Sequence, residues 1–217
     1  MSLKLYFHPL ASYCQKVLIA LYENETPFTA ELVDLGNEAS RAAFLKVWPV
    51  GKFPVLHDEA RGRTVPESTI IIEYLAEHYP GRIALVPADA DQALQTRARD
   101  RFYDLYVHTP MQKIVGDRLR PRDKKDPFGV EQAKNALRLA YDLIEREIAG
   151  RTWDMGEAFS MADCAAAPAL FYANLVVPVA SAHAGVAAYL SRLMARASVA
   201  RVMQEAEPYL KNFPAEN

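Results

Sequence analysis

The sequence has only two cysteines in 217 residues, and their positions exclude several kinds of chemistry. Cys14 and Cys164 are too few and too widely separated for the disulfide framework of a small secreted protein. The segment that ends in the first of them is Ala11-Ser12-Tyr13-Cys14, so an alanine stands where a Cys-x-x-Cys motif has its first thiol. Disulfide exchange is therefore not expected as the main activity, and a reducing, cytoplasmic location is expected.

The chain also lacks a strong excess of charge and any long apolar run. Its 25 basic and 27 acidic residues give a net charge of -2, so neither nucleic acid nor an anionic membrane is expected as a partner. A membrane-spanning helix needs about 18 apolar residues, and the most apolar stretch, 165–182, is interrupted by Pro168, Asn174 and Pro178. No signal-peptide core precedes the first strand pattern. We interpret the basic run 118–125 as a solvated loop.

Hydrophobic periodicity predicts two domains of different character. Strand patterns fall at 3–7, 29–33, 54–57 and 64–65, and helical patterns at 16–22, 40–46 and 68–78. This order predicts an α/β domain over 1–79, with a small mixed sheet and helices packed on it. Pro80-Gly81 and Pro87 mark a linker over 80–90, and an all-α helical bundle is expected over 91–217.

The expected bundle has one distinctive helix at its centre. Ser160-Met161-Ala162-Asp163 has the spacing of a capping box and opens an Ala-rich helix that is apolar nearly all round, so this helix should be buried. Further helices are predicted over 92–107, 137–148, 186–196 and 199–205. Pro110 is expected to bend or end the first of these.

Three segments of the first domain should converge on one site. The turn 11–14 leads from a strand into a helix, whose positive dipole end stabilises an anion and favours loss of a proton from a thiol. Pro54 opens a strand and is predicted to follow a cis bond, which turns the backbone N–H and C=O of Phe53 outwards toward an extended peptide ligand. Glu67 and Ser68 begin the next helix, where they could hold an ammonium and a carboxylate.

Four segments together resemble the cytosolic glutathione transferases: Leu5-Tyr6-Phe7, Gly51-Lys52-Phe53-Pro54-Val55, 67–75 and Phe159-Ser160-Met161-Ala162-Asp163. The resemblance spans nearly the whole chain and implies a thioredoxin-like first domain before the helical one. It also implies that the Phe53 backbone, beside Pro54, binds the cysteinyl part of glutathione. Glu67 and Ser68 would take the γ-glutamyl end, and Lys52 would help with a carboxylate.

The residue that activates the thiol is left open by the sequence. Family members of the Ser and Cys types place it at a position that falls on Ala11 here, with Ser12 one step on and Cys14 three. Members of the Tyr type use a tyrosine late in the first strand, which corresponds to Tyr6 or, without a gap, to Phe7. Ser12 is our prediction, and Tyr6, Cys14 or none of them are the alternatives.

Structural roles compete with these assignments. Ser12 could serve only as a helix N-cap, Cys14 as a buried apolar residue and Tyr6 as a sheet residue. Tyr103 and Tyr106 could be core residues or line a pocket facing the turn.

The resemblance predicts that the chain binds glutathione and transfers its thiol to a hydrophobic electrophile. It implies a homodimer, and glutathione is a co-substrate, so no metal or organic cofactor is expected. A glutathione-dependent isomerase or dehalogenase is the first alternative. The second is a non-enzymatic glutathione- or ligand-binding protein, an alternative that the alanine at position 11 leaves open.

Overall fold

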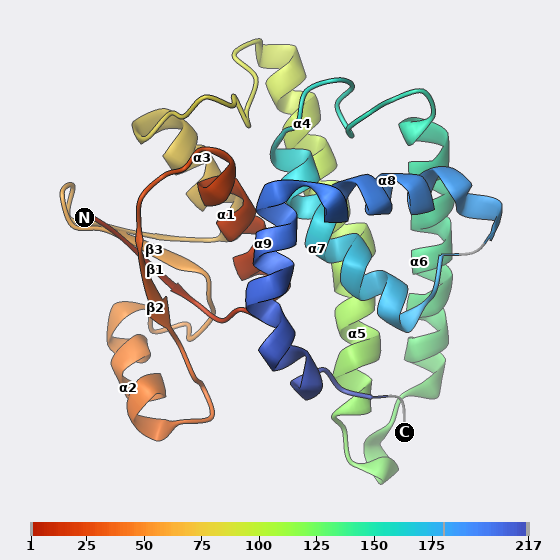
Figure 1. The fold of residues 1–217 in the computed structure, drawn as a ribbon. Coiled ribbons are helices and arrows are strands. Elements are labelled where there is room, and N and C mark those ends of the chain that lie inside the picture. The colour runs from red at the N-terminus through yellow and green to blue at the C-terminus, as the bar shows by residue number, and fades with distance from the viewer. Residues whose placement is uncertain (1, 180, 216–217) are drawn as a thin grey trace.

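A computed structural model describes residues 2–179 and 181–215 of the chain and contains a mixed four-stranded sheet followed by a helical bundle (Figure 1). The strands are β1 (Leu3–Phe7), β2 (Thr29–Leu32), β3 (Val55–Asp58) and β4 (Arg63–Pro66), in the order β2-β1-β3-β4. β2 runs parallel to β1, whereas β3 and β4 are antiparallel to their neighbours. The helices of this part are α1 (Ser12–Glu23), α2 (Glu38–Val47) and α3 (Ser68–His78). The predicted thioredoxin-like α/β class is confirmed.

The alternation predicted for the first strand is present in the structure. Leu3, Leu5 and Phe7 are buried, and the residues between them are half-buried. The buried set packs with the apolar residues of α1 and α3 in the main core. Because side chains alternate across a strand, Tyr6 belongs to the other face of the sheet.

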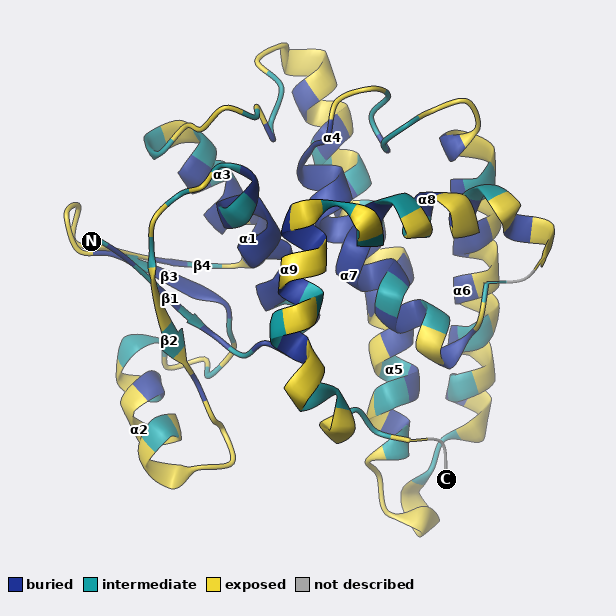
Figure 2. Cartoon of the chain, viewed as in Figure 1, coloured by how far each residue is buried: buried dark blue, intermediate teal, exposed yellow. Residues whose placement is uncertain are grey.

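The helical part surrounds one buried helix, α7 (Met161–Val176), as Figure 2 shows in dark blue. The predicted capping box is present, since Ser160 and Asp163 bond reciprocally at the start of α7. Asp163 Oδ2 accepts from the Ser160 N–H at 2.8 Å, and its Oδ1 accepts from the Tyr189 hydroxyl at 2.6 Å. The other helices are α4 (Ala90–Phe102), α5 (Thr109–Arg118), α6 (Pro127–Ile148), α8 (Ala184–Ala195) and α9 (Ala197–Ala206).

Pro110 was expected either to bend or to end its helix, and the helix does not end there. A π-helical segment, Tyr103–His108, joins α4 to α5, and Pro110 lies in the first turn of α5. A proline lacks the backbone N–H and crowds the carbonyl four residues earlier, so a regular helix cannot pass through it unchanged. Here the wider π turn accommodates the change and the helix continues.

A buried ionic cluster connects the sheet domain to the helical domain. Lys16 Nζ of α1 lies 2.6 Å from Asp100 Oδ1 and 2.9 Å from Asp104 Oδ2. The same ammonium donates to Thr69 Oγ1 of α3 at 2.9 Å, and Thr69 donates to Asp100 at 2.7 Å. One cation therefore fixes α1, α3, α4 and the π-helical segment relative to one another.

None of the helices in the described parts of the chain combines the length and apolar character needed to cross a membrane.

Candidate active site

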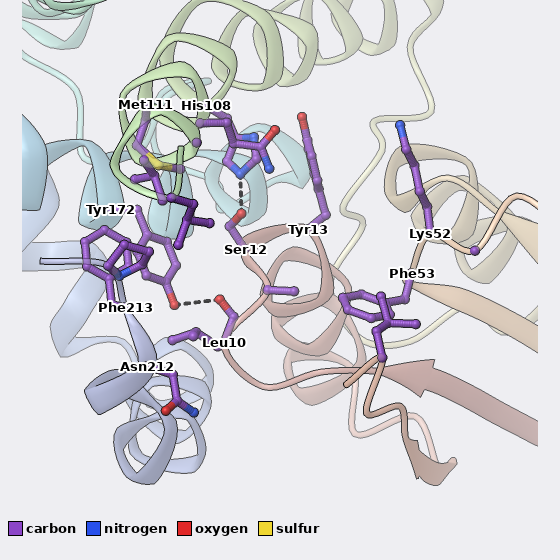
Figure 3. A pocket seen from close by; sticks show the side chains of 18 residues that line it. Leu10, Ser12, Tyr13, Lys52, Phe53, His108, Met111, Tyr172, Asn212 and Phe213 are labelled. Atoms are coloured by element: carbon purple, nitrogen blue, oxygen red, sulfur yellow. Dashed lines mark hydrogen bonds between the residues drawn. The ribbon is translucent and has the colours of Figure 1, made fainter. Parts of the chain in front are cut away.

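The candidate site begins at the turn between β1 and α1. Ala11 is the N-cap of α1, with an extended backbone (φ -82°, ψ 116°), and its methyl group cannot cap the helix. The first backbone N–H groups of α1 therefore lack a side-chain cap and present a positive dipole end. A cavity of about 670 Å³ opens beside this turn (Figure 3). Its walls come from residues 10–13, from 51–53, from α5 and from the C-terminal segment 212–214.

Ser12 does not act as the N-cap, because it is the first residue of α1 and its hydroxyl has another partner. Ser12 Oγ is hydrogen-bonded with His108 Nε2 from the π-helical segment, as the dashed line in Figure 3 marks. Both side chains are buried and both line the cavity. The ring of Tyr13 lies against the imidazole, with 4.1 Å between ring centroids.

His108 is neutral at ordinary pH. Burial and then the charge of Lys16 lower the pKa of its imidazole to about 3. Its Nδ1 atom is buried without a hydrogen-bond partner in the described structure. A buried N–H without a partner is less favourable than a buried lone pair without one, so the imidazole proton is favoured on Nε2. Nε2 then donates to Ser12 Oγ, and the Ser12 proton is left to donate to a ligand.

Lys52 and Phe53 lie across the cavity from Ser12. The Phe53–Pro54 peptide is cis, as the sequence predicted. Gly51 has a φ of +70°, which residues with a side chain rarely adopt, and this conformation turns the chain toward Lys52 and Phe53. The Phe53 ring packs on His8 with 6.3 Å between centroids, and the exposed Lys52 side chain extends from the rim (Figure 3).

Glu67 and Ser68 border this region without lining the cavity. β3 and β4 pair Val55 with Pro66, so the next residue, Glu67, follows directly beside Pro54. Glu67 is the N-cap of α3 with a φ of 69°, and its exposed side chain makes no capping bond. Ser68 is buried at the first position of α3. The carboxylate is therefore free for a cationic ligand group.

Two of the alternative activators lie outside the cavity lining. Tyr6 packs against Phe44 of α2, with 6.0 Å between ring centroids, on the opposite face of the sheet. Cys14 is completely buried in the main core, and burial raises the pKa of its thiol well above the usual range. Tyr103 is a core residue whose hydroxyl donates to Asp154, and Tyr106 is 60% exposed.

Several cavity residues were not identified from the sequence, and most of them are apolar. Tyr172 of α7 donates its hydroxyl to the Leu10 carbonyl at 2.9 Å, and Phe213 stacks on its ring at 5.6 Å (Figure 3). Met111 and Val115 of α5 and Leu119, its C-cap, are spaced four residues apart and line the cavity. The spacing along α5 was a usable signal, whereas nothing local indicated His108 or the C-terminal segment.

Within the described ranges, no group of three or more histidine, cysteine, aspartate or glutamate side chains is placed so that it could hold a metal ion.

A thioredoxin-like domain whose cis-proline segment faces a helix N-terminus, with a helical domain closing the cavity, defines a two-domain class of glutathione-binding fold. Sequence models of the family match both parts: "Glutathione S-transferase, N-terminal domain" over residues 5–82 and "Glutathione S-transferase, C-terminal domain" over 127–192. The chain belongs to the glutathione S-transferase family, and its activity class is that of a glutathione transferase.

Named relatives agree with this assignment. The chain is 31% identical over 158 residues to the glutathione S-transferase-like protein LUC7 of a Fusarium species, covering 72% of this chain and 68% of that protein. It is 26% identical over 160 residues to glutathione S-transferase GstB of Escherichia coli K12, covering 72% and 76%. Among solved structures, a glutathione S-transferase of Methylobacillus flagellatus with glutathione bound is similar, with a TM-score of 0.84 and 25% identity. The match covers 93% of this chain and 98% of that one.

Proposed function

We propose that the chain binds glutathione beside the cis-proline segment and transfers its thiol to a hydrophobic electrophile in the adjoining cavity. The observation that carries the proposal is that Ser12, at the N-terminus of α1, lines the same cavity as Lys52 and Phe53. Phe53, next to Pro54, would pair its backbone with the cysteinyl part of glutathione. That pairing directs the sulfur toward the N-terminus of α1.

The two ends of glutathione have matching groups nearby. The exposed carboxylate of Glu67 would take the ammonium of the γ-glutamyl end, and Ser68 with the N-terminus of α3 would take its carboxylate. Lys52 would hold a second carboxylate from the rim of the cavity. Because Glu67 and Lys52 are exposed, each contact should contribute modestly, about 1 kcal/mol or less.

Ser12 is the proposed activator of the thiol. Lowering a thiol pKa from about 9 to about 7 requires about 2.7 kcal/mol of preferential stabilisation of the thiolate. One hydroxyl hydrogen bond to the anion and the N-terminus of α1 together supply about that much. The contact from His108 supports this role, since an Nε2–H that donates to Ser12 Oγ leaves the hydroxyl proton available for sulfur.

The electrophile would occupy the apolar side of the cavity. Met111, Val115, Leu119 and Phe213 present aliphatic and aromatic surface there. A thiolate formed next to such a wall meets an apolar electrophile in a partly dehydrated environment, which strengthens its nucleophilic attack. A detoxification role fits this chemistry. An isomerase or dehalogenase would use the same thiolate and remains the first alternative.

One observation favours a second function, the binding of glutathione or of apolar ligands without turnover. Ala11 provides no hydroxyl or thiol, and the hydroxyl of Ser12 already has a partner in His108. If the proton of Ser12 is donated to His108, none is left for sulfur. The position of that one proton therefore separates enzyme from carrier.

A homodimer and a cytoplasmic location belong to the same proposal. Ile70, Leu105 and Tyr106 are each more than half exposed and lie on α3 and the π-helical segment. Pairing of this face with a second copy would bury them. Sedimentation of the wild type and of Leu105→Asp tests this: the wild type should sediment as a dimer and the variant as a monomer, and a monomeric wild type would refute it.

The proposal is tested by measuring glutathione binding by calorimetry and turnover of a generic aryl halide on the same protein. Both should be present in the wild type, and glutathione bound without turnover would support the carrier instead. No glutathione binding would contradict the transferase and the glutathione carrier, and only a carrier of apolar ligands would be left.

A further inference from the structure

The loop between β1 and α1 (8–11) leads into the helix end that is proposed to activate the thiol, and side chains from outside the loop hold its backbone. The Pro9 carbonyl accepts from Gln15 Nε2 of α1 at 2.8 Å. The Leu10 carbonyl accepts from the Tyr172 hydroxyl of α7 at 2.9 Å, as a dashed line in Figure 3 marks. The position of the loop therefore depends on two side chains, one of which belongs to the helical domain.

Gln15 and Tyr172 also bond to each other. Gln15 Nε2 donates to the Tyr172 hydroxyl oxygen at 3.0 Å, and that hydroxyl in turn donates to the Leu10 carbonyl. Both hydrogens of the Gln15 amide are therefore used, and the two side chains form one continuous chain of hydrogen bonds onto the loop. Hydrogen bonds arranged in this way polarise and strengthen one another, so the loss of one member weakens the others.

These bonds leave one atom of Gln15 unsatisfied. The side chain is completely buried, and its Oε1 atom has no hydrogen-bond partner in the described structure. A buried acceptor without a partner destabilises a fold, whereas a methionine would fill a similar volume without that loss. The specific contribution of a glutamine at this position is therefore its pair of donors, which fix the loop.

Tyr172 is a hydrogen-bond donor throughout the ordinary pH range. Burial is the main cause that raises the pKa of its hydroxyl to about 12. Its ring lies in the cavity wall and stacks on Phe213, with 22° between the ring planes, so packing sets the direction of the hydroxyl. Because that hydroxyl is already bonded to Gln15 and Leu10, it acts on the loop and not on a ligand.

The position of the loop determines where Ser12 lies. Leu10 precedes Ser12 by two residues, and the hydroxyl of Ser12 is bonded to His108. The helical domain therefore holds this turn at two points, through Tyr172 and through His108. A displacement of about 1 Å in a reacting geometry can lower a rate on the order of a hundredfold, because hydrogen bonds weaken steeply when they are misaligned.

We propose that Tyr172 and Gln15 are positioning residues, which hold the loop 8–11 so that Ser12 and the N-terminus of α1 face the sulfur of glutathione. This inference rests on the proposed function and adds a role for the helical domain in activating the thiol. Without the Tyr172 hydroxyl, the Leu10 carbonyl loses its partner and the loop can move away from the sulfur. The bound thiol is then less acidic.

The test compares two tyrosine variants of the full chain. Tyr172→Phe keeps the ring and removes the hydroxyl. Tyr141→Phe is the matched control, because Tyr141 of α6 is also buried and donates to the Val177 carbonyl at 3.0 Å, but does not line the cavity. Gln15→Met removes the donors of the second positioning residue. Thermal melting checks that each protein is folded.

Three quantities are measured on each protein. Ultraviolet absorbance of the thiolate gives the pKa of bound glutathione, calorimetry gives the glutathione affinity, and turnover of an aryl halide from about pH 6 to about pH 9 gives kcat and KM. A pH profile separates positioning of the thiol from a loss of stability, since a merely structural bond does not change the acidity of the ligand.

In Tyr172→Phe, we expect the pKa of the bound thiol to rise by about 1 unit, so that turnover near about pH 6 falls about tenfold. The difference in kcat should shrink as the pH rises above the thiol pKa, because the thiolate is then fully formed in both proteins. Gln15→Met should shift this pKa in the same direction, and the double variant should shift it by less than the sum of the single shifts. Tyr141→Phe should leave it unchanged.

Three results would overturn the proposal. The first is an unchanged thiol pKa in Tyr172→Phe, and a raised KM for the aryl halide would then make Tyr172 a direct contact of the electrophile. The second is an equal rise of the thiol pKa in Tyr141→Phe, and the third is an unchanged thiol pKa in Gln15→Met. A wild type whose bound thiol titrates like free glutathione would refute the proposed function itself, whereas a lowered pKa that persists in Tyr172→Phe refutes only the positioning role.

Discussion

Ser12 and His108 meet across the domain boundary although they are 96 residues apart in sequence. One helical turn further along α1, Lys16 pairs with Asp104, which precedes His108 by four residues on the π-helical segment. A hydrogen bond and an ion pair therefore both connect α1 to the π-helical segment. The ionic pair fixes their distance, and the hydrogen bond places an imidazole against the hydroxyl proposed to activate glutathione.

The first prediction concerns the pH dependence of stability. The pKa of His108 is lowered from 6.5 to about 3, mainly by burial. As the pH falls from about 6.5 to about 3, the unfolded chain takes up a proton that the folded chain does not, so His108 makes the protein less stable. His108→Phe removes this effect. Urea unfolding over this pH range should give a shallower pH dependence for the variant, by about 1 kcal/mol per pH unit.

The carboxyl of Asp163 has the opposite effect on the pH dependence of stability, in the wild type and in His108→Phe alike. Burial raises the pKa of its carboxyl to about 6, so the folded state takes up that proton first and gains stability as the pH falls. This contribution cancels when the variant is compared with the wild type. Parallel stability curves for the two proteins would show that His108 is not held neutral by the fold.

The second prediction concerns the γ-glutamyl end of glutathione. Glu67→Gln keeps the shape of the side chain and removes its charge. Because Glu67 is exposed, the loss should be about 1 kcal/mol, which is about fivefold in affinity. Glu77→Gln, on the exposed face of the same helix, is the matched control and should bind glutathione as the wild type does. Equal affinity of both variants by calorimetry would remove Glu67 from the site.

The third prediction concerns the domain interface. Lys16→Met removes the cation that neutralises two buried carboxylates, Asp100 and Asp104, and should cost about 3–5 kcal/mol in the free energy of unfolding. Lys4→Met breaks a solvent-exposed ion pair with Glu59 and should change the free energy of unfolding far less. Chemical denaturation of both variants measures the difference. Similar small losses in the two would mean that the interface does not depend on this cluster.

The sequence predicted the elements that depend on local patterning. The alternation of Leu3, Leu5 and Phe7 identified the buried face of β1, and the spacing of Ser160 and Asp163 identified the start of α7. These signals are local because capping and strand alternation involve residues only a few positions apart. The convergence of Ser12, Lys52 and Phe53 was also predicted. Ser12 directly follows the first predicted strand, and Lys52 and Phe53 directly precede the strand that begins at Pro54.

The rest depended on contacts between distant residues. His108, which contacts Ser12, ends a π-helical segment, Tyr103–His108, and a helical pattern of period 3.6 does not indicate that segment. The place of Phe213 in the cavity depends on how the C-terminal segment returns to α7. The basic run 118–125 is largely the exposed loop that was predicted, since residues 119–124 are all exposed, but the position of Lys134 beside it depends on the packing of α6.

The central claim is that Ser12 and the N-terminus of α1 stabilise the thiolate of bound glutathione. Titration of the ultraviolet absorbance of that thiolate, in the wild type and in Ser12→Ala, tests it most directly. In the wild type, the account predicts a thiol pKa about 2 units below that of free glutathione. In Ser12→Ala, this pKa should be higher by about 1 unit or more, and turnover at neutral pH should be lower by one or two orders of magnitude. A bound thiol that titrates like free glutathione, or one that titrates identically in both proteins, would contradict it.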